Sequence, residues 1–136
     1  MIVHEDRIEA LVQAAVEARL RAYAPYSRFQ VGAAILDCQG QIFTGCNVEN
    51  ASYSLCLCAE RTAGGHAVAS GSKNWLAIAI ATAGGVAPCG ACRQFLVEFG
   101  SDLEVISVAI DQAKRRRWKL KELLPDRFDQ QNLPLS

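Results

Sequence analysis

Hydrophobic positions near the start of the chain recur at intervals of three and four residues, from Ile8 to Leu20. This spacing is typical of an amphipathic helix with one buried face. Pro25 follows, and we expect the helix to end before it, because the residue ahead of a proline disfavours helical backbone.

Four later segments have the hydrophobic patterns of strands. Residues 29–36 and 41–48 flank Asp37-Cys38-Gln39-Gly40, which is typical of a turn, so they predict a β-hairpin. Residues 75–82 and 103–110 are nearly continuous apolar runs. Such runs favour strands that are buried on both faces of a sheet.

Helices are predicted between these strands, over 58–69 and 89–99, and a short last helix is predicted over 118–124, before Pro125. The order is then α-β-β-α-β-α-β-α. It predicts an α/β fold, namely a three-layer α/β/α sandwich with one mixed sheet. We expect a single domain over 1–136.

The composition changes this picture little but excludes some functions. The 136 residues include 14 basic and 14 acidic side chains, so the formal net charge is zero. A polynucleotide-binding protein needs a basic excess to neutralise phosphates, so we expect no nucleic-acid partner. Hydrophobic residues make up 51% and charged residues 21%, which is ordinary globular composition.

The sequence predicts a cytoplasmic location with no membrane contact. Glu5, Asp6 and Arg7 interrupt the first residues, which does not fit a signal peptide. The longest apolar stretch, 76–86, is 11 residues long, whereas a membrane-spanning helix needs about 20. In a reducing compartment the six cysteines favour metal-binding or catalytic roles over disulfides.

Three of the cysteines have the spacing of a metal site. Cys89 and Cys92 are three residues apart and would share one face of a helix, and Cys58 lies at the start of another predicted helix. The exposed N–H groups and the dipole of a helix start favour the thiolate form. Thiolates select Zn²⁺, and three protein ligands leave one position open, as in a catalytic site.

Glu60 lies two residues after Cys58, near the predicted ion, where a carboxylate can act as a general acid and base. The pattern of His or Cys, x-Glu and then Pro-Cys-x-x-Cys is characteristic of zinc deaminases that act on nucleobases. A C-x-x-C pair alone is equally typical of a redox pair or of half a structural zinc site. Combined with the upstream Cys-Ala-Glu, it is much more specific.

Five motifs in the same order make the chain resemble the small homotetrameric cytidine deaminases, over nearly its whole length. They are Tyr26-Ser27-Arg28-Phe29-Gln30-Val31-Gly32-Ala33-Ala34, Gly45-Cys46-Asn47-Val48-Glu49-Asn50-Ala51-Ser52-Tyr53, Cys58-Ala59-Glu60-Arg61-Thr62-Ala63, Pro88-Cys89-Gly90-Ala91-Cys92-Arg93-Gln94, and Glu122-Leu123-Leu124-Pro125 followed by Phe128.

The resemblance implies a role for each residue of the metal motifs. Cys58, Cys89 and Cys92 would bind one Zn²⁺ per chain. Glu60 would be the catalytic residue that moves protons. Arg61 would donate hydrogen bonds to the ligand thiolates and draw negative charge away from sulfur, which would keep the ion a strong Lewis acid.

The resemblance also implies a nucleoside site shared between subunits of a homotetramer. Asn47 and Glu49 would bind ribose hydroxyls, and the backbone of Ala59 would meet the base. Tyr53 and Phe128 would reach a neighbouring subunit's site. The full implied substrate-binding set is Phe29, Asn47, Glu49, Ala51, Tyr53, Ala59 and Phe128.

The implied activity is a hydrolase reaction of pyrimidine salvage: cytidine and 2′-deoxycytidine become uridine and 2′-deoxyuridine, and ammonia is released. If Glu49 accepts a hydrogen bond from the 3′-hydroxyl, a phosphodiester there would be repelled, which favours free nucleosides. The alternatives are a deaminase of a modified cytidine or a cytosine nucleoside antibiotic, a non-catalytic zinc- or nucleoside-binding protein, and a thiol oxidoreductase that uses Cys89 and Cys92.

Several residues outside these motifs have competing interpretations. Cys56 or Cys46 could be a fourth ligand that closes the metal site. We expect His66 to be structural and the basic run 114–121 to be a solvated face rather than a nucleic-acid patch. The Gly64-Gly65 pair lowers helix propensity and allows either close helix approach at a subunit interface or a looser helix.

Overall fold

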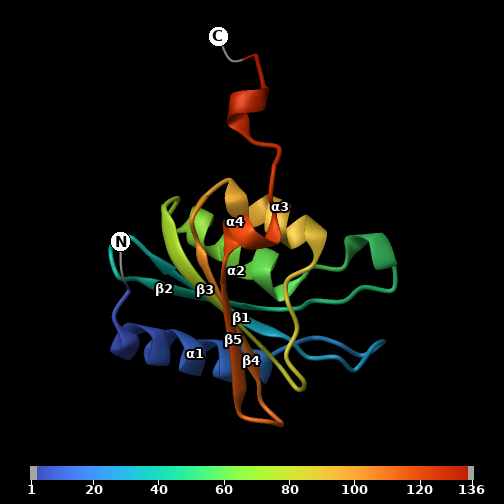
Figure 1. Cartoon of the computed structure of the whole chain (residues 1–136). Helices are drawn as coiled ribbons and strands as arrows, with labels where there is room; N and C mark the ends of the chain where they lie inside the picture. Colours follow the sequence, from blue (N-terminus) through green and yellow to red (C-terminus); the bar gives the residue numbers. More distant parts are fainter. Residues whose placement is uncertain (1–2, 135–136) are drawn as a thin grey trace.

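A five-stranded mixed sheet separates two layers of helices (Figure 1). The computed structural model describes residues 3–134. In the order β2-β1-β3-β4-β5, β3 and β4 are parallel and the other neighbours are antiparallel. The strands are β1 (Gly32–Asp37), β2 (Ile42–Cys46), β3 (Trp75–Thr82), β4 (Glu104–Ala109) and β5 (Lys114–Lys119).

Among the described residues, helix α1 (Glu5–Arg19) is the one helix on its face of the sheet (Figure 1). Ile8, Leu11, Val12 and Ala15 are buried against β1, β3 and β4, as the spacing predicts. Leu20, at the end of the periodic run, lies just beyond the helix and is 71% exposed. The helix lies very close to β1, because a Cβ atom at Gly32 would be 2.1 Å from the carbonyl oxygen of Ala15. Only glycine fits at that crossing.

Helices α2 (Ala59–Ala69), α3 (Gly90–Val97) and the short α4 (Leu120–Leu123) cover the other face. Their apolar side chains form a second core with the opposite side of the same strands. The predicted three-layer α/β/α sandwich with a mixed sheet is therefore confirmed.

The C-terminal part of the sequence prediction is wrong in one respect. Residues 118–124 were expected to form a helix, but Lys114–Lys119 is strand β5 and only Leu120–Leu123 is helical. A run of basic residues hides the alternation that marks a strand. The segment is fixed instead by antiparallel pairing with β4 and by ion pairs of Arg115 and Arg117 with acidic side chains of α1 and β4.

The two glycines of α2 have different surroundings. A Cβ atom at Gly64 would lie 2.3 Å from the ring of Phe95, so this glycine lets α2 and α3 pack closely within the chain. Gly65 is exposed and faces open space. On the same helix the Nδ1 atom of His66 lies 3.0 Å from the carbonyl oxygen of Thr44, which agrees with a structural role.

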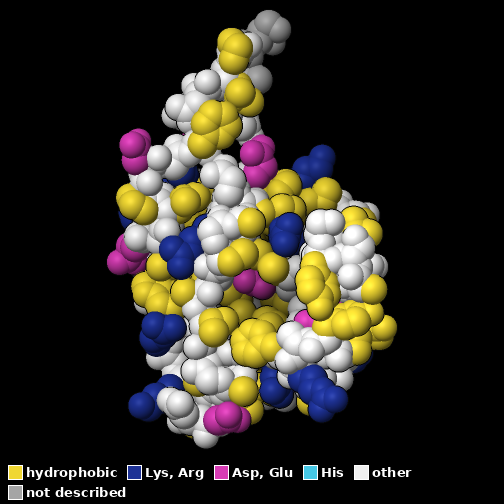
Figure 2. Space-filling model, turned by 90° about the vertical axis from the view of Figure 1, so that its right-hand side faces the viewer, with side chains coloured by type: hydrophobic (Ala, Val, Ile, Leu, Met, Phe, Trp, Pro, Cys, Tyr) yellow, Lys and Arg dark blue, Asp and Glu magenta, His cyan; other side chains and the backbone are white. Residues whose placement is uncertain are grey.

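Two 3₁₀ helices, η1 (Tyr53–Leu55) and η2 (Gln130–Asn132), lie in segments outside the sandwich. The segment that carries η2 projects from the body of the molecule in both views (Figures 1 and 2). Within residues 3–134, every helix is too short or too polar to cross a membrane.

Candidate metal centre and adjoining cavity

Three cysteine side chains meet where two helices begin. Cys58 is the N-cap residue of α2, Cys89 is the N-cap residue of α3, and Cys92 lies in the first turn of α3 with no exposed surface. Their sulfur atoms all lie within 4.8 Å of one another. The structure thus confirms the predicted helix starts and the convergence of the three thiols.

The arrangement fits a single thiophilic ion. Two sulfur atoms that bind one zinc at about 2.3 Å are less than about 4.6 Å apart, so small side-chain movements suffice to close the cluster on zinc. Cys56 and Cys46, the two candidates for a fourth ligand, form hydrogen bonds with backbone groups outside the cluster. Cys56 accepts a hydrogen bond from the backbone N–H of Asn50 at 3.3 Å, and the Cys46 thiol donates to the carbonyl oxygen of Arg21 at 3.5 Å.

The protein stabilises negative charge on this cluster. Arg61 donates a hydrogen bond from Nη2 to the Cys58 sulfur at 3.4 Å. Hydrogen bonds from the Cys92 thiol and from Arg61 lower the pKa of Cys58 to about 5. The pKa of Cys92 is raised, because its proton is shared with Cys58 and its side chain is buried. A thiolate is therefore in place before a metal ion displaces the remaining protons.

Glu60 lies beside this cluster in the first turn of α2 and is 6% exposed. Burial raises the pKa of its carboxyl group above the usual value, and the negative charge of Cys58 adds to the effect. A carboxyl group that keeps its proton at higher pH can act as a proton donor as well as an acceptor.

A cavity of about 290 Å³ opens next to the cysteines, close to the lower end of the range of about 300–1,000 Å³ that is usual for small-molecule sites. Figure 2 shows hydrophobic side chains gathered over much of one face of the molecule. The residues that line the cavity are Phe29, Val31, Asn47, Glu49, Cys56, Leu57, Cys58, Ala59, Glu60, Val86, Ala87 and Cys89.

Asn47 braces one wall of the cavity and is 8% exposed. Its Oδ1 atom accepts a hydrogen bond from the backbone N–H of Val31 at 2.9 Å, and its Nδ2 atom donates to the carbonyl oxygen of Phe29 at 2.7 Å. The amide therefore holds the segment that carries Phe29 against the strand end that carries Asn47.

Glu49 is held by hydrogen bonds from the segment between α1 and β1. Its carboxylate accepts backbone hydrogen bonds from Tyr26 at 2.9 Å and from Ser27 at 3.1 Å, and the Ser27 hydroxyl donates to it as well. The hydroxyl is the main reason why the pKa of Glu49 lies below its usual value. Ser27 is a contributor that the sequence alone did not identify, although it lies inside one of the quoted motifs.

Arg93 is a second contributor that the sequence did not identify. Its Nε atom donates to the carbonyl oxygen of Pro88 at 2.7 Å, and its Nη1 atom donates to that of Leu123 at 2.9 Å. It thereby links α4 to the backbone that leads into Cys89. The only sequence signal was its place in the motif of the second metal segment.

Three of the predicted substrate-binding residues do not line this cavity. Ala51 is exposed, and Tyr53 is 74% exposed at the edge of a neighbouring cavity of about 320 Å³. The Phe128 side chain is 58% exposed, and its carbonyl oxygen accepts a hydrogen bond from Nε2 of Gln94 on α3 at 2.8 Å. The chain by itself therefore brings Phe29 to the cysteine cluster but leaves the other two aromatic rings outside.

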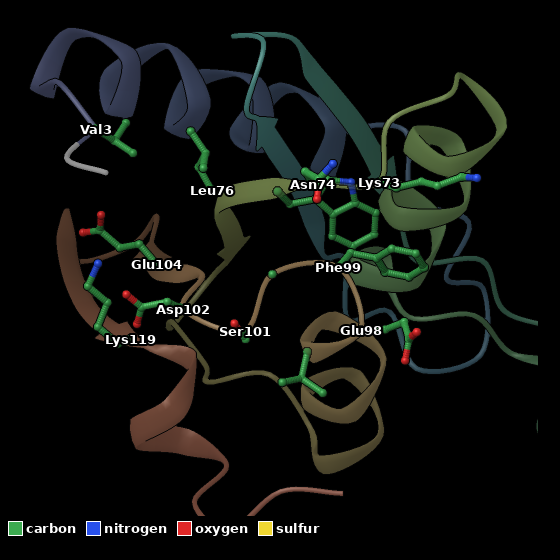
Figure 3. A pocket seen from close by; sticks show the side chains of 13 residues that line it. Val3, Lys73, Asn74, Leu76, Glu98, Phe99, Ser101, Asp102, Glu104 and Lys119 are labelled. Carbon is green, nitrogen blue, oxygen red and sulfur yellow. The ribbon is translucent and has the colours of Figure 1, made fainter. Parts of the chain in front are cut away.

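A larger cavity, of about 410 Å³, opens where β3 and β4 begin (Figure 3). Its charged side chains are of both signs: Lys73, Lys119, Glu98, Asp102 and Glu104. Neither the cysteines nor Glu60 line it. The candidate metal ligands and the candidate proton-transfer residue therefore lie at the smaller cavity.

Comparison with known proteins agrees with this location. The family model described as the cytidine and deoxycytidylate deaminase zinc-binding region matches residues 5–109, which include all three clustered cysteines and Glu60.

Individual relatives cover most of the chain. A cytidine deaminase of Sporosarcina psychrophila is 41% identical over 93% of this chain and 94% of its own length. A cytidine deaminase of Mycobacterium tuberculosis is 45% identical over 88% of each chain. The crystal structure of cytidine deaminase from Burkholderia pseudomallei matches with a TM-score of 0.84 and 48% identity, over 93% of this chain and all of that one.

Proposed function

Because the chain belongs to the cytidine and deoxycytidylate deaminase family, we propose that it is a zinc-dependent hydrolase that converts cytidine and 2′-deoxycytidine to uridine and 2′-deoxyuridine, with release of ammonia. The observation that supports this most directly is the meeting of three thiols and the buried Glu60 carboxyl group at one small cavity.

Cys58, Cys89 and Cys92 would hold the zinc ion. When bound, the ion would act as a Lewis acid that makes water nucleophilic near neutral pH. Arg61 limits how much negative charge the thiolates pass to the ion, because it donates a hydrogen bond to Cys58.

Glu60 moves protons between water and substrate. It accepts a proton from water and delivers one to N3 of the cytosine ring, which makes C4 more electrophilic. After the remaining hydroxyl has added at C4, Glu60 takes the proton of that hydroxyl and delivers it to the exocyclic nitrogen; the C4–N bond then breaks, ammonia leaves, and C4 becomes the carbonyl carbon of the uracil ring. General acid and base catalysis of this kind contributes about 10²–10⁴ in rate.

The far wall of the cavity suits a free nucleoside. Ionised Glu49 is positioned by Ser27 to accept a hydrogen bond from the 3′-hydroxyl, and Phe29 lies beside it. A phosphodiester at that hydroxyl would place a second negative charge next to Glu49, so DNA and RNA are disfavoured.

The proposal is tested by measuring ammonia release from cytidine, 2′-deoxycytidine and N4- or C5-substituted cytidines, using protein of known zinc content. Glu60→Gln should lose about 10²–10⁴ in kcat but keep its zinc. Glu17→Gln, the same chemical change on the exposed face of α1, serves as the matched control.

Three outcomes count against the proposal. Substantial activity in Glu60→Gln would contradict the proton-transfer role. A zinc-loaded wild-type protein that releases no ammonia from any member of the panel would instead indicate a binding protein. Release from a substituted cytidine alone would point to a modified nucleoside as the substrate.

We also propose that the active unit is a homotetramer in which subunits share sites. Tyr53 and Phe128 are exposed and lie outside their own chain's cavity, which supports a place for them in a neighbour's site. Light scattering gives the oligomeric state. Phe128→Ala should raise KM without removing zinc if the ring contacts a nucleoside.

A cytoplasmic place in pyrimidine salvage is part of the same proposal. It is supported by a zero net charge, by free cysteines throughout the described residues, and by a cavity sized for a nucleoside. We expect neither nucleic acid nor membrane among the partners. Cell fractionation checks the location directly.

A further inference from the structure

Strand β5 divides its positive charges between the two faces of the sheet. Arg115 and Arg117 point toward α1 and form ion pairs with acidic side chains of α1 and β4. Lys114 and Arg116 alternate with them and therefore lie on the opposite face. Among residues 3–134, no acidic side chain lies within ion-pair distance of Lys114 or Arg116.

A cavity of about 140 Å³ lies on that opposite face. Ser107 of β4 is paired in register with Arg116, so their side chains share the face, and both line the cavity. The loop after β3 forms the other wall at Gly84 and Gly85. The cavity is thus lined by residues of two strands, of the turn that joins them and of a loop, so it is a depression rather than a patch of charge on one strand.

Ser107 carries an unmet hydrogen-bonding group at this cavity. The residue is 2% exposed, and its Oγ atom has no hydrogen-bond partner within the described part of the chain. A buried hydroxyl without a partner is unfavourable, so such groups usually face a ligand, an ion or water. Since Ser107 lines the cavity, a small rotation of its side chain would let the hydroxyl donate a hydrogen bond to an acceptor there.

The lining of the cavity favours an anion. Lys114 and Arg116 supply two positive charges, and the residues of the described chain that line the cavity include no carboxylate. We propose that this cavity binds a small oxyanion of the phosphate class, with Arg116 and Lys114 as its counter-charges and the Ser107 hydroxyl as a hydrogen-bond donor. Its volume suits a compact group, since a water molecule occupies about 30 Å³ in the liquid.

The proposed site lies behind the loop that forms the nucleoside cavity. The chain runs from Gly84 and Gly85 directly into Val86 and Ala87, which line the cavity beside the cysteines. The inference rests on the geometry around Ser107 and does not depend on the deaminase activity, so the two proposals can fail separately.

The experiment is isothermal titration calorimetry of zinc-loaded protein at constant ionic strength. One arm uses inorganic phosphate and the other ribose 5-phosphate, which represents a phosphate monoester. Arg116→Gln should weaken the binding of either probe about tenfold, because a charged hydrogen bond is lost. Ser107→Ala should weaken it by about threefold or more.

Arg115→Gln is the matched control. It removes the same charge from the neighbouring residue of the same strand, but on the face that points to α1. At physiological salt we expect it to change the affinity less than about twofold, because screening limits the effect of a charge that does not touch the ligand. Thermal unfolding verifies that each variant is folded.

The outcomes separate a site from a diffuse charge effect. Saturable binding that Arg116→Gln and Ser107→Ala weaken, and Arg115→Gln does not, supports the proposal. The arm with the higher affinity identifies free phosphate or a monoester as the source. Absence of saturable heat in both arms, equal losses in Arg115→Gln and Arg116→Gln, or unchanged affinity in folded Ser107→Ala would each overturn it.

Discussion

Replacement of Arg61 by glutamine tests how the protein adjusts the metal centre. Three thiolates place three negative charges on a 2+ ion, which weakens it as a Lewis acid. The guanidinium of Arg61 opposes this effect, since its Nη2 atom lies 3.4 Å from the Cys58 sulfur and donates to it. The Nε atom of Arg61 is buried without a hydrogen-bond partner in residues 3–134, so the guanidinium acts on the cluster through the hydrogen bond of Nη2 to Cys58.

The size of the effect follows from that single contact. A hydrogen bond with a charged partner contributes about 1.5–3 kcal/mol. At about 1.4 kcal/mol for each factor of ten, its loss corresponds to roughly 10- to 100-fold. Substitution of residues that hydrogen-bond to metal ligands typically lowers activity or metal affinity by about the same factor. We therefore expect kcat of Arg61→Gln to fall by about 10- to 100-fold while zinc remains bound, because all three sulfur ligands are still present.

The assay measures ammonia release per bound zinc, with the metal content of each sample determined by mass spectrometry. Arg61→Lys keeps the charge but not the planar donor group, so its kcat should lie between those of wild type and Arg61→Gln. Wild-type turnover in zinc-loaded Arg61→Gln would refute the reasoning. Loss of the metal in that variant would show that Arg61 serves binding of the ion rather than its reactivity.

Three further predictions concern the metal set, the glycine pair and the ribose carboxylate. Cys56→Ser should retain zinc, whereas serine at any of the three clustered cysteines should abolish zinc binding; metal analysis of a zinc-free Cys56→Ser would instead indicate a fourth ligand. Gly64→Ala should lower the free energy of unfolding by about 1 kcal/mol or more, because an aromatic ring must move, and Gly65→Ala should raise it by about 0.5–1 kcal/mol; denaturant titrations that give both changes the same sign contradict the packing. Ser27→Ala removes the hydrogen bond that lowers the pKa of Glu49, so that pKa rises toward 4.5. A carboxylate with a lowered pKa loses its charge only as pH falls through that value, so KM for cytidine should begin to rise at a higher pH in the variant; superimposable pH profiles would disprove the link.

Most of the sandwich could be predicted from the sequence because its patterns are local. The three- and four-residue spacing from Ile8 to Leu20 marks α1, and the apolar run 75–82 marks β3, whose side chains are almost all buried. Strand β5 could not be predicted, because Lys114–Lys119 is stabilised by long-range pairing and by ion pairs with distant acidic residues. Neither the strand pairing nor the ion pairs can be predicted from the local pattern of hydrophobic residues.

The candidate site divides in the same way. Cys58, Cys89 and Cys92 could be identified because thiol spacing and helix starts are visible along the chain. The hydrogen bond from Ser27 to Glu49 joins residues that are 22 apart in sequence, so it can be identified only in the folded structure, where the two loops meet. Sequence reasoning thus identified the reactive groups and, through the resemblance, the contact of Arg61 with Cys58, but not the contacts of Ser27 and Arg93.

The projecting C-terminal segment has a consequence for how catalysis depends on concentration. The Phe128 side chain, near the base of this segment, is 58% exposed and does not line its own chain's cavity beside the cysteines. If such rings complete sites in adjacent copies, dilution should lower the specific activity of the enzyme before it unfolds the polypeptide. The assembly equilibrium would then set the fraction of working catalysts in a sample.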